Sequence, residues 1–231
     1  MGSYLDNRYQ NIQVCGWESF NSKPREDDMI ALTHIMRDPA GFREKWIKPY
    51  GQKGVKPYPS AQPGGISQYD AEFYYWLPTW KRMPGYIQPM TKMEVQTQTY
   101  LCCDRGIADL MAYRTDKLFR DFPELGGIYY DICDVKTCGN TAHGCGGTDA
   151  FGKPYLSSTA MQLRHYLMRI YKVAHKHGKR VFNHAHNYFN PVAHNFSDIW
   201  YPGENEVWLY GMNPDHYYCE APLNEYQCAW N

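Results

Sequence analysis

Three short apolar segments of the chain each run into polar residues at their C-terminal ends. They span residues 126–132, 180–187 and 197–204. Apolar runs of this length, rich in aromatic and branched side chains, predict buried strands. Strands that release polar side chains at one common end are typical of a parallel α/β barrel, which builds its active site at that end.

An amphipathic stretch separates the first two of these strands. Its apolar residues recur at helical spacing across residues 159–177, and Gly178 follows as a suitable residue to end a helix. The order strand, helix, strand implies parallel pairing through a right-handed crossover. The expected buried face of this helix comprises Leu163, Leu167, Ile170 and Ala174.

A second helix is expected from Asp104, a plausible N-cap, because an apolar stripe follows it. That stripe comprises Ile107, Leu110, Met111, Leu118 and Phe119. Further expected elements are strands at 11–19 and 100–103, a helix at 27–37 and a short helix after Pro39. Residues 54–59 also suggest a strand, but two prolines predict that only its first residues pair on both sides.

Together these elements predict an α/β fold of the (β/α)8 TIM-barrel type. About four parallel strands can be assigned, whereas a closed barrel needs eight, so the barrel is expected to be incomplete or part of a longer chain. Residues 1–231 are expected to form a single barrel-like domain or a fragment of one. Residues 60–103 interrupt it as an aromatic-rich excursion without a clear period.

Charge and hydropathy exclude several classes of partner. The chain has 24 basic and 24 acidic residues and no basic stripe, so nucleic acid is not expected to bind. No run of about eighteen apolar residues is present, which argues against a membrane span. The N-terminus lacks the charged and apolar regions of a signal peptide, and the compartment is left open.

Aromatic residues make up 16% of the chain, which is a high share. Most of them are expected to fill the core. Some can instead form platforms for sugars, whose C–H faces suit aromatic rings, and Trp80 and Tyr130 are candidates for substrate contacts of this kind.

Three of the eight cysteines lie close together with one histidine, as Cys133, Cys138, His143 and Cys145. Thiolates and imidazole at short spacing could hold zinc. The spacing matches no standard finger or ribbon, however, so a loop disulfide such as Cys138–Cys145, or packed thiols, is the prediction. Neither a metal nor another cofactor is expected.

Two carboxylates are the candidates for catalysis. Asp131 ends an apolar strand, where a charge is costly unless it is paired or faces a wet cleft. Glu204 follows a Pro-Gly turn that should expose it at the mouth of the barrel, and Glu206 could serve in its place. Two carboxylates at such positions suit glycoside hydrolysis. Asp198 is expected to point toward the barrel wall.

His184 and His186 alternate along one strand, so their side chains point to the same side. They could recognise sugar hydroxyls together with Asn187, or bind a metal with His194 as a third ligand. They could also be a polar layer inside the barrel. Asp149 lies in the glycine-rich loop 133–155, which is expected at the same end as Asp131. It could fold over the cleft to bind substrate, or simply form an Asx turn.

The stretch from Gly127 to Glu204 resembles the barrel domain of proteins similar to glycoside hydrolase family 123. The resemblance rests on the segments 129–131, 138–146, 149–152, 184–187 and 202–204. It covers about a third of the chain and implies a carbohydrate-active enzyme with a (β/α)8 barrel. The chain is much shorter than those proteins, and the adjacent Asp-Glu pair that the family uses for acetamido-assisted hydrolysis is not evident.

Three hypotheses follow for function. The first is a glycoside hydrolase that acts on a carbohydrate with Asp131 as nucleophile or charge-stabilising carboxylate and Glu204 as acid. The second is a metal-dependent hydrolase that uses His184, His186 and either His194 or Asp131. The third is a non-catalytic carbohydrate-binding or structural domain.

Overall fold

The computed structural model describes the central part of the chain and several shorter segments. The described residues are 13–15, 40, 43–52, 56–67, 71–84, 87–89, 97–184, 191–201, 213 and 215. The helix expected at 27–37 lies outside them. Glu204, Glu206, His186 and Asn187 also lie outside.

The elements alternate between strands and helices along much of this region. The strands are β1 Gln13–Cys15, β2 Lys56–Tyr58, β3 Ser60–Ala61, β4 Gly65–Ser67, β5 Ile87–Pro89, β6 Thr97–Tyr100, β7 Gly127–Tyr130, β8 Thr137–Cys138, β9 Gly146–Thr148, β10 Pro154–Ser158, β11 Arg180–His184 and β12 Ile199–Tyr201. The helices are a π-helical turn Arg43–Ile47, α4 Lys48–Gly51, α5 Ala71–Trp80, α6 Arg105–Asp121, a 3₁₀ turn Thr141–His143, α7 Ala160–Lys176 and α8 Pro191–His194.

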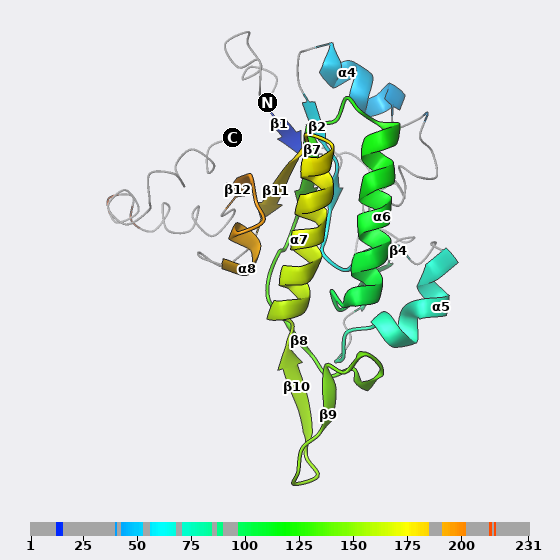
Figure 1. Ribbon diagram of the computed structural model, residues 1–231, viewed down its shortest axis with the longest axis vertical. Coiled ribbons are helices and arrows are strands. Elements are labelled where there is room, and N and C mark those ends of the chain that lie inside the picture. The colour runs from blue at the N-terminus through cyan, green and yellow to red at the C-terminus, as the bar shows by residue number, and fades with distance from the viewer. Residues whose placement is uncertain are drawn as a thin grey trace.

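A parallel sheet lies at the centre of the fold. Its strand order is β12-β11-β7-β3, and each neighbouring pair runs parallel. The prediction that the three apolar segments form neighbouring parallel strands is therefore confirmed. Helix α7 makes the crossover between β7 and β11, and it lies beside α6 on one face of the sheet (Figure 1).

Two prolines, Pro57 within β2 and Pro59 just after it, contact the segment around β7 through their carbonyl groups. The carbonyl of Pro57 accepts the amide of Gly126 at 3.1 Å, and that of Pro59 accepts the amide of Tyr129 at 3.0 Å. On the other side, β2 pairs parallel with β1, with Pro57 opposite Val14. Pro57 therefore has backbone neighbours on both sides, because proline lacks a donor but keeps its acceptor. The limit on pairing expected for 54–59 stays a prediction, since residues 54 and 55 lie outside the described residues.

The helical face of the sheet carries the main hydrophobic core. Helix α6 begins after Asp104 as expected, and α7 buries the predicted face together with Tyr166. From the sheet, Tyr130 points into this layer, where its hydroxyl lies 3.2 Å from that of Tyr166. Gly178 follows the end of α7 by two residues and has a left-handed conformation, with a φ angle of 65°.

The opposite face of the sheet carries a second set of aromatic side chains. Tyr129 and Phe182 from neighbouring strands meet edge to face at 4.9 Å, and Tyr58 contacts Phe182 at 6.4 Å. Side chains alternate between the two faces of a strand, so Tyr129 and Tyr130 must point in opposite directions. Asp131 then follows on the same side as Tyr129.

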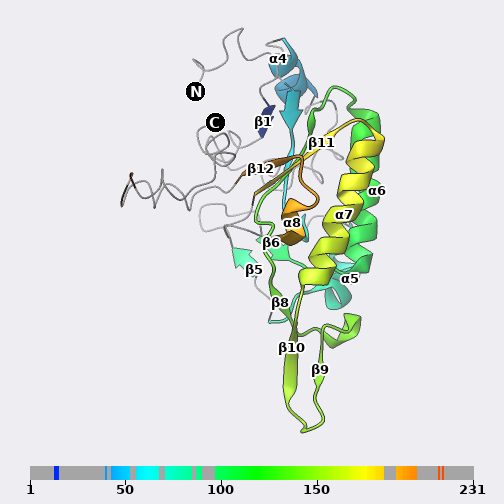
Figure 2. The ribbon, with the colours of Figure 1, turned by 60° about the vertical axis from the view of Figure 1, so that its left-hand side comes forward.

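Two antiparallel excursions leave the parallel sheet. The first contains the sheet β4-β6-β5 and helix α5 within residues 60–103. The sequence indicated no clear period there, partly because Pro78 lies inside α5. The second is the sheet β8-β10-β9 within the loop 133–155 and the residues after it. Its β9–β10 hairpin extends beyond the C-terminal end of β7 (Figures 1 and 2).

The described residues contain the parallel sheet and its helical layer, but not a closed barrel of eight strands. The α/β class is confirmed, and barrel closure stays a prediction. Within the part of the chain that the structure describes, no helix has the length and apolar character needed to cross a membrane.

Gly127 is expected to be essential for the pairing of β7 with β11. A Cβ atom at this position would lie 1.9 Å from the carbonyl oxygen of Arg180 and 2.5 Å from the ring of Tyr58. Gly127→Ala should therefore lower the free energy of unfolding by about 1–3 kcal/mol, the usual cost of overpacking. Denaturant unfolding measures this change.

Gly51→Ala is the matched control, because nothing lies within 4 Å of the added Cβ atom. Its free energy of unfolding should stay unchanged or rise by up to about 1 kcal/mol, because Gly51 is the last residue of helix α4. Equal stability of Gly127→Ala and the parent would contradict the pairing of β7 and β11 described above.

Candidate active site at the end of the parallel sheet

Three polar side chains meet at the C-terminal ends of adjacent parallel strands. Asp131 directly follows β7, His184 is the last residue of β11, and Gln62 directly follows β3. The Nδ1 atom of His184 lies 2.6 Å from Oδ1 of Asp131, and Nε2 of Gln62 lies 3.4 Å from Oδ2. The sheet register thus places these groups from three strands in one row.

The carboxylate of Asp131 is held by several donors. Besides His184, its Oδ1 atom accepts the backbone amide of Ile132 at 3.0 Å and the hydroxyl of Tyr129 at 3.3 Å. An ionised carboxylate only accepts, so Nδ1 of His184 carries the proton of their hydrogen bond. The side chains of Asp131 and His184 are 10% and 2% exposed, respectively. The pair is therefore oriented from within the protein rather than by solvent.

The backbone bends sharply directly after Asp131. Ile132 has a φ angle of 53°, in the left-handed region that a β-branched residue rarely adopts. This bend lets the next amide, that of Cys133, donate to the carbonyl of His184 at 2.7 Å. Strain of this kind costs about 1–3 kcal/mol and is concentrated at functional sites.

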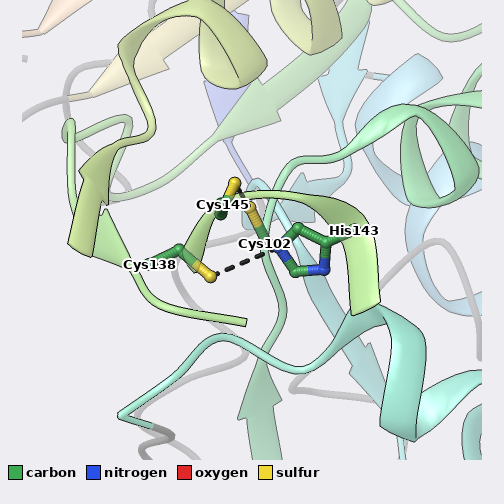
Figure 3. Close-up of side chains that lie close together, drawn as sticks. All are labelled: Cys102, Cys138, His143 and Cys145. Atoms are coloured by element: carbon green, nitrogen blue, oxygen red, sulfur yellow. Dashed lines mark hydrogen bonds between the residues drawn. The ribbon is translucent and has the colours of Figure 1, made fainter. Parts of the chain in front are cut away.

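A second group of reactive side chains comes together on the excursions. The side chains of Cys102, Cys138, His143 and Cys145 converge, and their potential ligand atoms all lie within 4.8 Å of one another (Figure 3). Cys133, which the sequence grouped with the last three, instead donates its thiol to the carbonyl of Tyr130 at 3.5 Å.

Sequence reasoning missed Cys102 because it lies far upstream of the other three. Its local signal was its place two residues before Asp104, the N-cap of α6. The Cys138–Cys145 bridge considered from the sequence is not formed, since both cysteines are free. Burial raises the pKa of the Cys102 thiol, and it also raises the pKa of the Cys145 thiol.

Two predicted substrate contacts lie inside the core. Tyr130 is fully buried against the helices, and burial raises the pKa of its phenol. Trp80 is 5% exposed, and its ring stacks on that of Trp76 at 5.5 Å. Both rings are buried, which favours a role in packing, and their contact with a substrate stays a prediction.

Asp149 lies at the exposed tip of the β9–β10 hairpin. Its Oδ1 atom accepts the amides of Phe151 and Lys153, each at 2.9 Å, which is an Asx turn. The hairpin leaves the sheet at the end that carries Asp131, as expected, but it extends outward (Figure 1). The hydrogen bonds of Asp149 give it a role in the turn, and its predicted contact with substrate gains no support.

The remaining candidates fall into two groups. The carboxylates Glu204 and Glu206, with His186 and Asn187, lie outside the described residues. His194 is on α8, where its ring stacks on Trp200 at 3.4 Å. Asp198 accepts the amide of Val181 at 2.8 Å and so supports the sheet, as expected for a residue of the wall.

No protein-family model matches the chain, and no curated protein matches it. The resemblance to the family 123-like barrel therefore stays a prediction. Comparison with solved structures does find similar proteins, and all three of those described next are glycoside hydrolases.

An α-N-acetylgalactosaminidase, NagBb from Bifidobacterium bifidum, is 14% identical over 77% of this chain and 26% of its own, with a TM-score of 0.46. The α-L-fucosidase isoenzyme 2 from Paenibacillus thiaminolyticus is 19% identical over 65% of this chain and 24% of its own, with a TM-score of 0.45. The glycoside hydrolase domain of PelA from Pseudomonas aeruginosa is 11% identical over 60% of this chain and 46% of its own, with a TM-score of 0.38.

The chain spans about a quarter of the length of the first two of these proteins. With TM-scores below 0.5, these similarities add no argument about the reaction. The case for a site rests on the side chains at the end of the sheet.

The left-handed conformation of Ile132 can be tested by comparing two substitutions at that position. At positive φ a Cβ atom is unfavourable, so Ile132→Gly should be more stable than Ile132→Ala by roughly 0.5–1 kcal/mol. Denaturant unfolding of the two variants measures the difference.

Lys117, on helix α6, provides the control position. There Lys117→Ala should be more stable than Lys117→Gly by about 1 kcal/mol, the order expected inside a helix. If the alanine variant is also the more stable one at position 132, the bend after Asp131 is not the one described.

Proposed function

We propose that this chain is part of a glycoside hydrolase that acts on a carbohydrate through a pair of carboxylates. The observation that carries the proposal is the hydrogen bond between Asp131 and His184 at the C-terminal ends of β7 and β11. In parallel α/β barrels that end of the sheet is where catalytic residues lie. The strained residue directly after Asp131 supports the same assignment.

Asp131 is proposed as the nucleophile, or as the carboxylate that stabilises an oxocarbenium-like charge. Three donors hold its Oδ1 atom, whereas the described contact of Oδ2 is the long one from Gln62 at 3.4 Å. Oδ2 is therefore the oxygen proposed to approach the anomeric carbon. The bonds to Oδ1 would keep the carboxylate from rotating while it does so, which lowers the cost of reaching the reactive geometry.

Glu204 is proposed as the acid that protonates the leaving oxygen, with Glu206 as the alternative. Both follow β12, which pairs with β11 on the side away from β7. A residue released after β12 would thus lie one strand beyond His184 at the same edge of the sheet. The separation of the two carboxyl groups decides between retention and inversion.

Hydroxyl recognition is proposed for the polar groups around this pair. His184 lies beside Asp131, and Gln62 adds an amide that sequence reasoning missed. Like Asp131, Gln62 is a polar residue directly after a strand, but β3 has only two residues and gave little sequence signal. His186 and Asn187, which follow β11, are proposed to complete the set.

The other two hypotheses are less well supported. A metal-dependent hydrolase would use His184, His186 and either His194 or Asp131, and His186 lies outside the described residues. Among the described residues, the group of ligands that converges is the thiol cluster instead. A non-catalytic carbohydrate-binding domain would bind a sugar without turnover, and assays with aryl glycosides distinguish it from an enzyme.

Asp131→Asn should abolish glycosidase activity and leave the fold intact. The amide is nearly isosteric, but it cannot act as an anionic nucleophile. We expect kcat to fall by roughly three orders of magnitude or more, equal to about 4 kcal/mol of barrier. Kinetics on aryl glycosides, with melting curves, measures both effects on a preparation shown to be active.

Glu204→Gln should behave differently, because substrates with good leaving groups need little protonation. It should keep more activity on activated aryl glycosides than on natural ones. Asp109→Asn, an exposed position on α6, is the control for the chemical change and should keep parent turnover. Near-parent turnover of Asp131→Asn, or its unfolding, would remove Asp131 from the catalytic role.

A further inference from the structure

The cluster of Cys102, Cys138, His143 and Cys145 is separate in its contacts from the Asp131–His184 pair. Three segments contribute to it: Cys102, which lies two residues before Asp104, the N-cap of α6; strand β8; and the turn that leads into β9. We propose that these four side chains bind one Zn²⁺ ion in a closed site that stabilises the fold. The first support is the convergence of four suitable ligand atoms within 4.8 Å.

Two distances between the ligand atoms are close to those around a tetrahedral ion. The Sγ atoms of Cys102 and Cys145 lie 3.8 Å apart, and Sγ of Cys138 lies 3.3 Å from Nε2 of His143. Zinc–sulfur bonds of about 2.3 Å place two sulfurs of a tetrahedron about 3.8 Å apart. A disulfide would need an S–S distance of about 2.05 Å. It would also involve only two of the four converging side chains.

The imidazole of His143 is held in the tautomer that binds metal. Its Nδ1 atom lies 2.5 Å from the backbone carbonyl oxygen of Thr79. A carbonyl only accepts, so Nδ1 carries the proton and Nε2 presents a lone pair toward the sulfurs (Figure 3). Metal-binding histidines are oriented in this way by a hydrogen bond to the other ring nitrogen.

Neighbouring groups orient the sulfurs as well. The side-chain amide of Gln162 donates to Sγ of Cys145 at 3.4 Å, and the backbone amide of Asn140 lies 3.5 Å from Sγ of Cys138. Hydrogen bonds from such donors orient the sulfur ligands of a metal site. The side-chain amide nitrogen of Asn140 also lies 2.7 Å from the carbonyl oxygen of Lys81, which holds this turn against the end of α5.

The alternative explanation is a small apolar core made of buried thiols. A core of that kind normally includes aliphatic or aromatic side chains. Here the three cysteines form a buried cluster of their own, distinct from the main core. Three thiolates and one neutral imidazole are a ligand set that zinc prefers.

Four protein ligands leave no open position, which is typical of a structural rather than a catalytic zinc site. The ion would join the β8-β10-β9 excursion to the start of α6, and His143 extends the link to α5. This excursion exposes Tyr155 and Leu156 by 45% and 54%, so it has little hydrophobic packing to hold it. Zinc is therefore proposed to supply stability that the excursion lacks.

The test uses the full chain purified without chelators. Elemental analysis should find zinc, and X-ray absorption at the zinc edge should show three sulfur ligands and one nitrogen at about 2.3 and 2.0 Å. This measurement needs no variant and so does not depend on whether a substituted protein folds. Absence of zinc, a different metal, or an oxygen-rich ligand shell would overturn the proposal.

Substitutions then assign the ligands. Cys102→Ser should lower zinc affinity by more than about 100-fold, because even residues that only support a ligand are worth 10–100-fold. Cys103→Ser is the matched control, since this neighbouring thiol is also buried and free but lies outside the cluster. Unchanged affinity of Cys102→Ser, or a Cys102–Cys145 disulfide found by mass spectrometry of the parent, would overturn the assignment.

Discussion

The alternation of side chains along β7 is the constraint on which the rest of the structure depends. Tyr130 points into the helical layer and is fixed there by Tyr166, so Tyr129 and Asp131 must point to the opposite face. The pairing of β7 with β11 then brings His184 beside Asp131. A slip of one residue in this register would bury the carboxylate among the apolar side chains of α6 and α7.

The same constraint separates two tasks within one short strand. One face of β7 packs in the core, where the burial of large rings supplies most of the stability. The other face ends in a polar row whose members come from different strands. The backbone turns abruptly at Ile132, directly after this row, and the strain at that point is offset by the packing on both sides.

Much of this arrangement could be predicted from sequence, because it depends on local periodicity. The three parallel strands, α6, α7 and the position of Asp131 all follow from patterns within about twenty residues. The side of the sheet to which Tyr130 points could not be predicted in the same way. Strand β7 is buried on both faces, so its sequence does not show which face packs against the helices. The packing of Trp80 in a helix was not foreseen, because Pro78 obscured the helical pattern around it.

The thiol cluster illustrates a different limit. Cys138, His143 and Cys145 share a short segment and were grouped correctly, but their spacing matched no known zinc motif. The fourth member, Cys102, joins them only through the packing of α5 and α6 against the excursion. No local pattern in the sequence predicts a contact that depends on tertiary packing. Gln62 is similar, since a strand of two residues between prolines gives little signal that it ends at the site.

The central claim is that Asp131 and a carboxylate after β12 face one another across a single site. The most direct test is a crystal structure of the complete protein with a bound sugar, measuring the separation of the carboxyl groups of Asp131 and Glu204. The account predicts about 5–5.5 Å for a retaining enzyme or about 6.5–9.5 Å for an inverting one, with the anomeric carbon between them. A structure in which neither Glu204 nor Glu206 lies within about 10 Å of Asp131, or in which the sugar binds elsewhere, would contradict it.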